Sequence, residues 1–66
     1  MLNQEAELGG EVLTVPQTAE ILQVHPQMVY DLITRGELHP LRVGRLIRLT
    51  RAELQRWMSE KVGAEG

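Results

Sequence analysis

The sequence predicts a mainly α fold with one small β-hairpin, in the order helix, turn, helix, hairpin, helix. Three observations predict it: apolar residues recur at helical spacing in three short segments, one stretch alternates instead, and glycine or proline separates these segments. A chain of 66 residues holds one domain at most. We expect that domain at 12–62, between a disordered acidic N-terminal tail at 1–11 and a disordered C-terminal end at 63–66.

The first helix is predicted at 15–22. Thr14 is a good N-cap residue, and Gln17 follows three positions later, so the two form a capping box. Pro16 falls in the first turn, where its missing N–H group costs no hydrogen bond. The apolar stripe of this helix consists of Val15, Ala19 and Leu22.

The second helix is predicted at 26–35, after a turn of three residues. Pro26 disfavours helix at His25 and suits the first position of a new helix, and Gly36 ends that helix. We expect His25 to cap it and Val24 to be a buried anchor in the turn. The buried stripe is predicted to consist of Val29, Leu32 and Ile33. Two short helices joined by so tight a turn form the helix-turn-helix pattern.

A β-hairpin is predicted at 41–49, because the apolar period changes there from helical spacing to alternation. Gly44 and Arg45 form its two-residue loop. The side chains expected toward the core are those of Val43, Ile47 and Leu49. The side chains expected toward solvent are those of Arg42 and Arg48. Since an isolated hairpin is marginally stable in water, this one must pack on the helices.

The third helix is predicted at 51–61, with a second capping box formed by Thr50 and Glu53 and with Gly63 just past its end. Its apolar stripe consists of Leu54, Trp57 and Met58. We expect Trp57, the largest apolar side chain available, to close the core. The basic residues expected on its solvated face are Arg51 and Arg56. With this helix, the predicted order is helix, turn, helix, small hairpin, helix, and the local signals agree with one another at nearly every junction.

The net charge of −2 hides an uneven distribution. Residues 1–11 carry three glutamates and no basic residue, whereas residues 35–56 carry six arginines and two glutamates, a charge of +4. Arginine suits phosphate groups and base edges better than lysine, because its planar guanidinium can donate two parallel hydrogen bonds. The middle of the chain therefore favours nucleic acid as a partner, although the chain as a whole is acidic.

Composition and motifs exclude several other classes of protein. The chain has no cysteine, and His25 and His39 lie far apart, so we expect no disulfide, metal or cofactor. We find no apolar run long enough to span a membrane and no signal-peptide pattern. Neither a phosphate-cradling glycine loop nor a nucleophile with a base is visible. We therefore expect a cytoplasmic protein that is not an enzyme.

Several short motifs, each weak alone, occur together in a specific order. They are Leu13-Thr14-Val15, Ala19-Glu20-Ile21-Leu22, Val29-Tyr30-Asp31-Leu32-Ile33, Gly36-Glu37-Leu38, Arg42-Val43-Gly44-Arg45, Arg48-Leu49, Glu53-Leu54 and Trp57-Met58. In this combination the sequence resembles the excisionase-type DNA-binding domains, a subset of the MerR-like winged helix-turn-helix proteins. The resemblance covers about two thirds of the chain.

This resemblance implies that the helix at 26–35 enters a major groove of double-stranded DNA, while the wing at 41–49 contacts the backbone or an adjacent minor groove. The DNA-binding residues it implies are Gln27, Met28, Tyr30, Asp31, Thr34 and Arg35 on the helix and Arg42, Arg45 and Arg48 on the wing. It also implies a recombination directionality factor or a small transcriptional regulator. The implied partners besides DNA are further copies of the chain on adjacent sites and a recombinase or integrase.

Two charged side chains, Asp31 and Arg48, each have more than one interpretation. Asp31 stands where the family often has a basic residue; it could accept a hydrogen bond from a cytosine amino group or pair with Arg35 one turn later. Arg48 could contact DNA or pair with Glu53 or Asp31.

A protein-interaction module is the alternative to a DNA-binding domain. Such a module would dock to a recombinase, a terminase or another DNA-processing partner through an exposed apolar patch. The candidate residues for that patch are Leu2, Leu8, Leu41 and Leu46.

Overall fold

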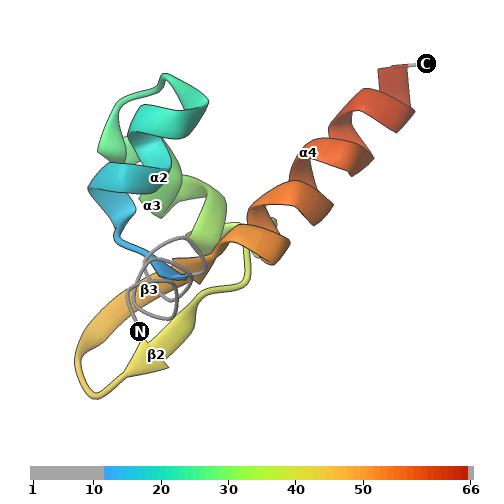
Figure 1. Cartoon of the computed structure of the whole chain (residues 1–66). Helices are drawn as coiled ribbons and strands as arrows, with labels where there is room; N and C mark the ends of the chain where they lie inside the picture. The colour runs from blue at the N-terminus through green and yellow to red at the C-terminus, as the bar shows by residue number, and fades with distance from the viewer. Residues whose placement is uncertain (1–11, 66) are drawn as a thin grey trace, which may run out of the picture.

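A computed structural model describes residues 12–65 and the side chains of residues 12–63. The predicted tail at 1–11 therefore lies outside the described residues. The described part forms three helices and three short strands, which is the mainly helical winged helix-turn-helix that the sequence predicts. In chain order the elements are β1 (Val12–Leu13), α2 (Val15–Leu22), α3 (Pro26–Thr34), β2 (Leu41–Val43), β3 (Leu46–Thr50) and α4 (Arg51–Glu65). Figure 1 shows α2 and α3 side by side, with the hairpin of β2 and β3 below them and α4 leading away.

Helix α2 begins and ends at the predicted residues, because both halves of its capping box form. The Thr14 hydroxyl accepts a hydrogen bond from the Gln17 backbone N–H at 3.1 Å, and the Gln17 side-chain oxygen accepts one from the Thr14 N–H at 3.0 Å. The helix ends at Leu22, and the following residue, Gln23, caps it in a left-handed conformation with φ of 60°. Gln23 is the non-glycine residue with positive φ in the described part of the chain.

The turn between α2 and α3 differs from the prediction in one respect. Val24 was expected to be its buried anchor, and this is wrong: its side chain is 37% exposed. The turn is instead held by the backbone, because the Val24 N–H donates to the Ala19 carbonyl at 2.9 Å. A left-handed residue at a helix end permits this kind of bond without a buried side chain.

Helix α3 begins as predicted, because His25 caps it. The His25 Nδ1 atom accepts a hydrogen bond from the Gln27 backbone N–H at 3.0 Å. The helix ends at Thr34, one residue before the predicted end, and Gly36 follows with φ of 82°. The next two N–H groups, of Glu37 and Leu38, both donate to the Leu32 carbonyl. This tight reversal delivers the Leu38 side chain to the core, where it is fully buried.

The sheet has three strands in the order β1-β3-β2, whereas the sequence predicted two. Strand β1 pairs with the end of β3, so that Val12 lies opposite Thr50 and Leu13 lies opposite Leu49. The short strand was missed because two residues carry no alternation. It covers the end of β3 that the hairpin leaves unpaired.

The hairpin register corrects the prediction for Val43. Val43 pairs with Leu46, and directly opposed residues share a face of the sheet, so Val43 and Ile47 face opposite ways. The Val43 side chain is 54% exposed, whereas Ile47 packs on the core. Arg42 pairs with Ile47 and is exposed, because it lies beyond the covered part of that face.

The core lies between the helix pair and the inner face of β3. Its buried side chains are Val15, Ala19, Val29, Leu32, Leu38 and Leu49, with Ile33, Ile47 and Trp57 packed partly buried against them. Trp57 therefore covers the core as expected, with one side of its ring in solvent. No helix of the described residues is long and apolar enough to cross a membrane.

Helix α4 follows β3 without a loop. The Thr50 hydroxyl, still in the strand, accepts the Glu53 backbone N–H at 3.0 Å, which is one half of the predicted capping box; the Glu53 carboxylate accepts from Arg56 and from the His39 N–H. The helix continues past the expected end at 61 to Glu65, because Gly63 does not end it. Leu54 anchors its first turns in the core with 1% exposure. The later turns extend away from the rest of the domain (Figure 1).

Candidate nucleic-acid interface

The outer face of α3 carries the residues that the resemblance implied. Val29 and Leu32 are buried, and this fixes which side of the helix faces outward. The exposed side chains on it are those of Gln27, Met28, Tyr30, Asp31, Thr34 and Arg35. The helix has 9 residues, and its outer face lies away from the core, where another molecule can reach it.

Asp31 lies at the centre of this face and contacts Gln27 one turn earlier. The Gln27 Nε2 atom donates a hydrogen bond to Asp31 Oδ1 at 3.3 Å. The pairing of Asp31 with Arg35, one of the two alternatives from the sequence, does not form within the described residues. The Arg35 guanidinium is exposed and stays on the outer side of the helix end.

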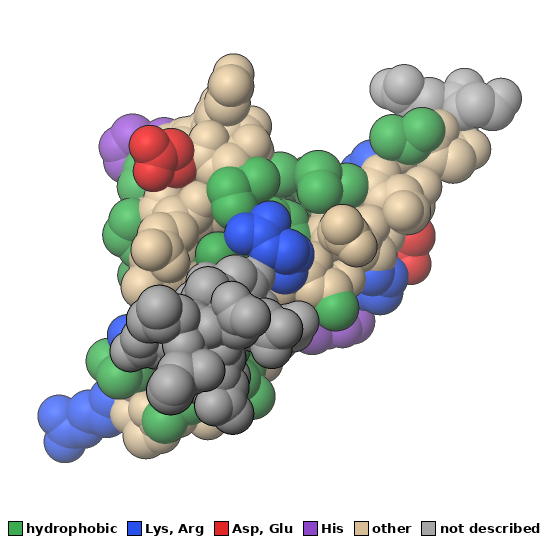
Figure 2. Space-filling view, in the orientation of Figure 1, with side chains coloured by type: hydrophobic (Ala, Val, Ile, Leu, Met, Phe, Trp, Pro, Cys, Tyr) green, Lys and Arg blue, Asp and Glu red, His purple; other side chains and the backbone are tan. Residues whose placement is uncertain are grey.

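The wing adds three arginines with two kinds of environment. Arg42 and Arg45 are exposed, and within residues 12–65 neither forms a side-chain hydrogen bond or ion pair. Arg48 is half-buried, and its Nη1 atom donates to the Ile47 carbonyl at 2.9 Å. The suggested pairs of Arg48 with Glu53 or Asp31 are absent from this part of the chain. Figure 2 shows basic side chains projecting at the free end of the hairpin.

A hollow between the wing and the helix pair brings several of these residues together. It has a volume of about 210 Å³. Three of its lining residues, Tyr30, Arg45 and Arg48, are candidate DNA-binding residues that come from two separate elements. The start of α2, together with Leu46 and Ile47 of β3, forms the remaining wall. The loop glycine permits this arrangement: Gly44 has φ of 63° and Arg45 does not have positive φ, which is the combination of a type II′ hairpin turn.

A polar cluster that sequence reasoning missed holds α4 against the segment after α3. Arg56 was expected on a solvated face, and this is wrong. Its Nε atom donates to Glu53 Oε1 at 2.9 Å, and its guanidinium also pairs with Glu60 and donates to the Glu37 backbone carbonyl. The i,i+3 and i,i+4 spacing of the three charges was the signal available in the sequence.

Glu53 is the acceptor at the centre of this cluster. Its Oε2 atom also accepts the His39 backbone N–H at 2.9 Å. The hydrogen bonds from Arg56, followed by that from His39, outweigh partial burial and lower the pKa of Glu53 from 4.5 to about 2. Glu53 in turn raises the pKa of Arg56 above its usual range. The carboxylate is therefore charged at every physiological pH.

Glu37 forms a second link between the same segments. Its Oε1 atom accepts from Trp57 Nε1 at 3.2 Å and pairs with Lys61 Nζ at 3.0 Å. These contacts, Lys61 first, lower the pKa of Glu37. The Lys61 ammonium also lies over the Trp57 ring, 5.6 Å from its centroid. Since β2 and β3 lie in the chain between Glu37 and Trp57, these contacts fix the base of the wing.

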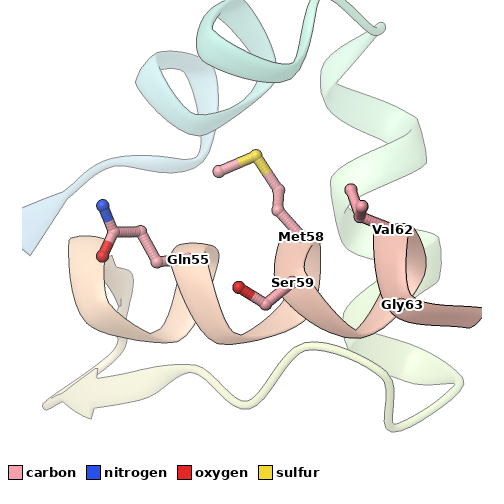
Figure 3. A pocket seen from close by; sticks show the side chains of 5 residues that line it. All are labelled: Gln55, Met58, Ser59, Val62 and Gly63. Atoms are coloured by element: carbon pink, nitrogen blue, oxygen red, sulfur yellow. The ribbon is translucent and has the colours of Figure 1, made fainter. Parts of the chain in front are cut away.

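Apolar side chains are exposed at two further places. Leu41, Val43 and Leu46 share the outer face of the wing and are 45–54% exposed, and Figure 2 shows hydrophobic side chains beside the hairpin end. Of the predicted patch, Leu41 and Leu46 are thus exposed, while Leu2 and Leu8 lie outside the described residues. A shallow hollow of about 640 Å³ follows α4, where Met58 and Val62 point toward the side of α2 and α3 (Figure 3).

The fold and its exposed arginine-bearing surface define a winged helix-turn-helix domain. A family model described as a helix-turn-helix domain matches residues 12–62, so the chain belongs to that family. Membership supports DNA as the partner. Neither the curated proteins nor the solved structures contain a significant match to this chain.

Proposed function

We propose that the protein binds double-stranded DNA sequence-selectively, with α3 in a major groove and the wing on the flanking backbone or minor groove. One observation carries this proposal: the hairpin end exposes Arg42 and Arg45 without a hydrogen bond or ion pair to their guanidinium groups in the described residues, and Arg35 is exposed at the end of the outer face of α3. The major groove is about 12 Å wide and admits an α-helix.

The two elements have different tasks in this proposal. Base edges are read by the polar side chains along α3, above all Gln27 and Thr34, with Met28 able to contact a thymine methyl group. Arg42 and Arg45 neutralise phosphates or enter a narrow minor groove, which attracts arginine. The hollow lined by Tyr30 and Arg48 accommodates the backbone between the two grooves.

The acidic balance of the chain sets the strength of this binding. The N-terminal 11 residues carry three glutamates, and Asp31 adds a negative charge on the DNA-facing side of α3. We therefore infer binding that is weak per copy, because few phosphates are neutralised, and that decreases with salt in proportion to the number of those phosphates. A recombination directionality factor or a small transcriptional regulator of the cytoplasm fits such a domain.

Binding of several copies on adjacent sites compensates for weak single contacts. The outer wing face of Leu41, Val43 and Leu46 supports this, since exposed apolar patches mark contact surfaces. The binding curve of a duplex with two tandem sites should then rise more steeply with protein concentration than the curve of a duplex with one site. Replacing Leu41 and Val43 by serine, two residues of this face that do not line the hollow beside Tyr30, should remove the steepness and leave the affinity for the single site unchanged.

Docking to a recombinase, a terminase or another DNA-processing protein is the second candidate function. The same outer wing face and the hollow along α4 favour it. It predicts that purified protein has no affinity for random duplex DNA even at low salt, which separates the two candidates.

Fluorescence anisotropy with a pool of random duplexes, over a salt series, tests the DNA proposal. The wild type should bind at low salt, and Arg45→Ala should bind more weakly with a salt slope smaller by about one unit. Lys61→Gln is the charge control, because it removes a positive charge from α4, outside the proposed DNA-binding residues; since Lys61 pairs with Glu37, thermal melts must show that this variant is folded like the wild type. Absence of binding at low salt would refute the proposal. Equal losses for Arg45→Ala and Lys61→Gln would refute the assignment of the wing.

A further inference from the structure

The hydrogen bond between Gln27 and Asp31 restricts how Gln27 can present its amide. Gln27 Nε2 donates to Asp31 Oδ1 at 3.3 Å, and both side chains are exposed at the centre of the outer face of α3. A free glutamine amide can rotate and exchange the positions of its oxygen and nitrogen. A carboxylate cannot accept from the amide oxygen, so Asp31 selects the orientation with the nitrogen toward itself. One N–H and the carbonyl oxygen remain available to a ligand.

The backbone beneath Gln27 is held as well. Its N–H donates to the His25 Nδ1 atom at 3.0 Å, and Pro26 fixes the first residue of the helix. The side chain therefore starts from a capped helix end and is tied one turn later, which leaves it few conformations. A recognition side chain ordered before binding loses less entropy on binding.

We propose that Gln27 recognises an adenine in the major groove and that Asp31 is the positioning residue that enforces this choice; this rests on the DNA-binding function proposed above. Adenine presents an N7 acceptor and an N6 donor, which match the remaining N–H and the oxygen of the Gln27 amide. Guanine presents two acceptors, N7 and O6. A glutamine whose second N–H is held by Asp31 has one donor for them, and its oxygen would face O6.

Asp31 thus lowers total affinity and raises selectivity. Its negative charge repels phosphates, so it weakens binding to every duplex by the same factor. Its hydrogen bond acts at one base pair alone. Specificity obtained by disfavouring the wrong partner commonly has this cost.

Enrichment of bound sequences from a random duplex library separates these two effects. The wild type should prefer adenine over guanine at one position by about fivefold or more, the range of a bidentate contact. Gln27→Ala should abolish that preference. Asp31→Ala should bind all duplexes more tightly at low salt, while its preference for adenine over guanine falls severalfold.

Two variants make the test specific to the hydrogen bond. Asp31→Asn loses the charge but can either accept from the Gln27 N–H or donate to the Gln27 oxygen, so its preference for adenine should lie between those of the wild type and Asp31→Ala. Glu20→Gln removes a charge of the same sign from the exposed side of α2 and should leave the sequence profile unchanged. Thermal melts of each variant confirm folding.

The outcomes of the experiment distinguish the two proposals. Selective binding by the wild type with an unchanged profile for Asp31→Ala would overturn the role of Asp31 and leave the DNA-binding function standing. An enriched base other than adenine at every position sensitive to Gln27→Ala would overturn the adenine assignment. Absence of binding by the wild type would refute both the DNA-binding function and the role of Gln27 and Asp31.

Discussion

The Arg56 guanidinium donates a hydrogen bond to the Glu37 backbone carbonyl at 2.9 Å, which joins α4 to the segment that leaves α3. The contact spans the whole wing in sequence, since β2 and β3 lie between these residues. The hydrogen bond therefore holds together the two ends of the segment that contains the wing, and the arginine-bearing hairpin tip lies at the far end of that segment. The relative position of α3 and the wing depends on this closure as much as on the apolar core.

Replacing Glu53 by glutamine should loosen that closure. The variant loses the charged acceptor of Arg56, and hydrogen bonds to charged groups contribute about 1.5–3 kcal/mol, so we expect a loss near the lower end of that range at neutral pH. Chemical denaturation of both proteins measures it. An unchanged midpoint would show that Arg56 is held by Glu37 and Glu60 alone.

The lowered pKa of the Glu53 carboxylate predicts that the fold is sensitive to acid. Its pKa falls from 4.5 to about 2 on folding, so the folded state binds fewer protons than the unfolded state between these values. The stabilisation is complete above pH 4.5 and decreases as the pH falls toward 2. Melting temperatures should follow this trend in the wild type. In Glu53→Gln the slope should be smaller but not zero, because the pKa of Glu37 is lowered too. Identical slopes would contradict the role of Glu53.

Gln23→Gly should stabilise the turn between the two helices. Gln23 has φ of 60°, a conformation that costs a residue with a side chain about 1–2 kcal/mol and costs glycine nothing. Glycine loses more backbone entropy on folding, and this offsets part of the benefit. We therefore expect a net gain in the free energy of unfolding of about 0.5–1 kcal/mol. Gln23→Ala keeps the unfavourable conformation and should give no gain. A loss for Gln23→Gly would mean that the side chain contributes contacts that outweigh the conformational cost.

Two glycines with open surroundings should respond to alanine in opposite ways. A Cβ atom at Gly44 or at Gly63 would meet nothing within 4 Å, so neither substitution creates a clash. Gly44 has φ of 63°, and Gly44→Ala should cost about 1–2 kcal/mol in the wing turn. Gly63 lies within α4, and Gly63→Ala should stabilise by up to about 1 kcal/mol. Denaturation midpoints that move the same way would contradict this account of the loop.

Trp57→Ala should unfold most of the domain. Loss of a packed tryptophan costs about 3–5 kcal/mol, and a domain of this length has a stability of that order. Trp57→Phe keeps the ring on the core and removes the indole N–H that donates to Glu37, so it should cost about 1 kcal/mol. Circular dichroism melts compare the three proteins. A melt of Trp57→Ala like that of the wild type would show that α4 does not cover the core.

The sequence predicted the local features well, because their causes are local. The capping box of Thr14 and Gln17, the cap at His25 and the loop at Gly44 depend on neighbours within four residues. Strand β1 was missed because Val12 and Leu13 become a strand through Thr50 and Leu49, far along the chain.

The errors on side-chain placement have physical causes of two kinds. Val43 was assigned to the wrong face, although a two-residue loop places it opposite Leu46 and hence away from Ile47. Because successive strand residues alternate between the two faces of the sheet, counting across the two-residue loop is enough to place Val43 correctly. The spacing of Arg56 from Glu53 and Glu60 does indicate its ion pairs, but its hydrogen bond to the Glu37 backbone carbonyl could not be predicted, because no side-chain pattern reveals a backbone acceptor. The candidate residues on α3 are exposed as expected, as are Arg42 and Arg45 on the wing, whereas Arg48 was expected toward solvent and is half-buried. The contacts of these residues with DNA stay a prediction.

Amide chemical-shift changes on titration with a duplex selected from the random pool test the central claim most directly. The account predicts that the largest changes lie in α3 and in the wing, from Gln27 to Arg35 and from Arg42 to Arg48. The amides along the α4 hollow, from Gln55 to Val62, should change little. Large changes confined to α4 or to the outer wing face, with none in α3, would contradict the assignment of α3 as the helix that enters the major groove.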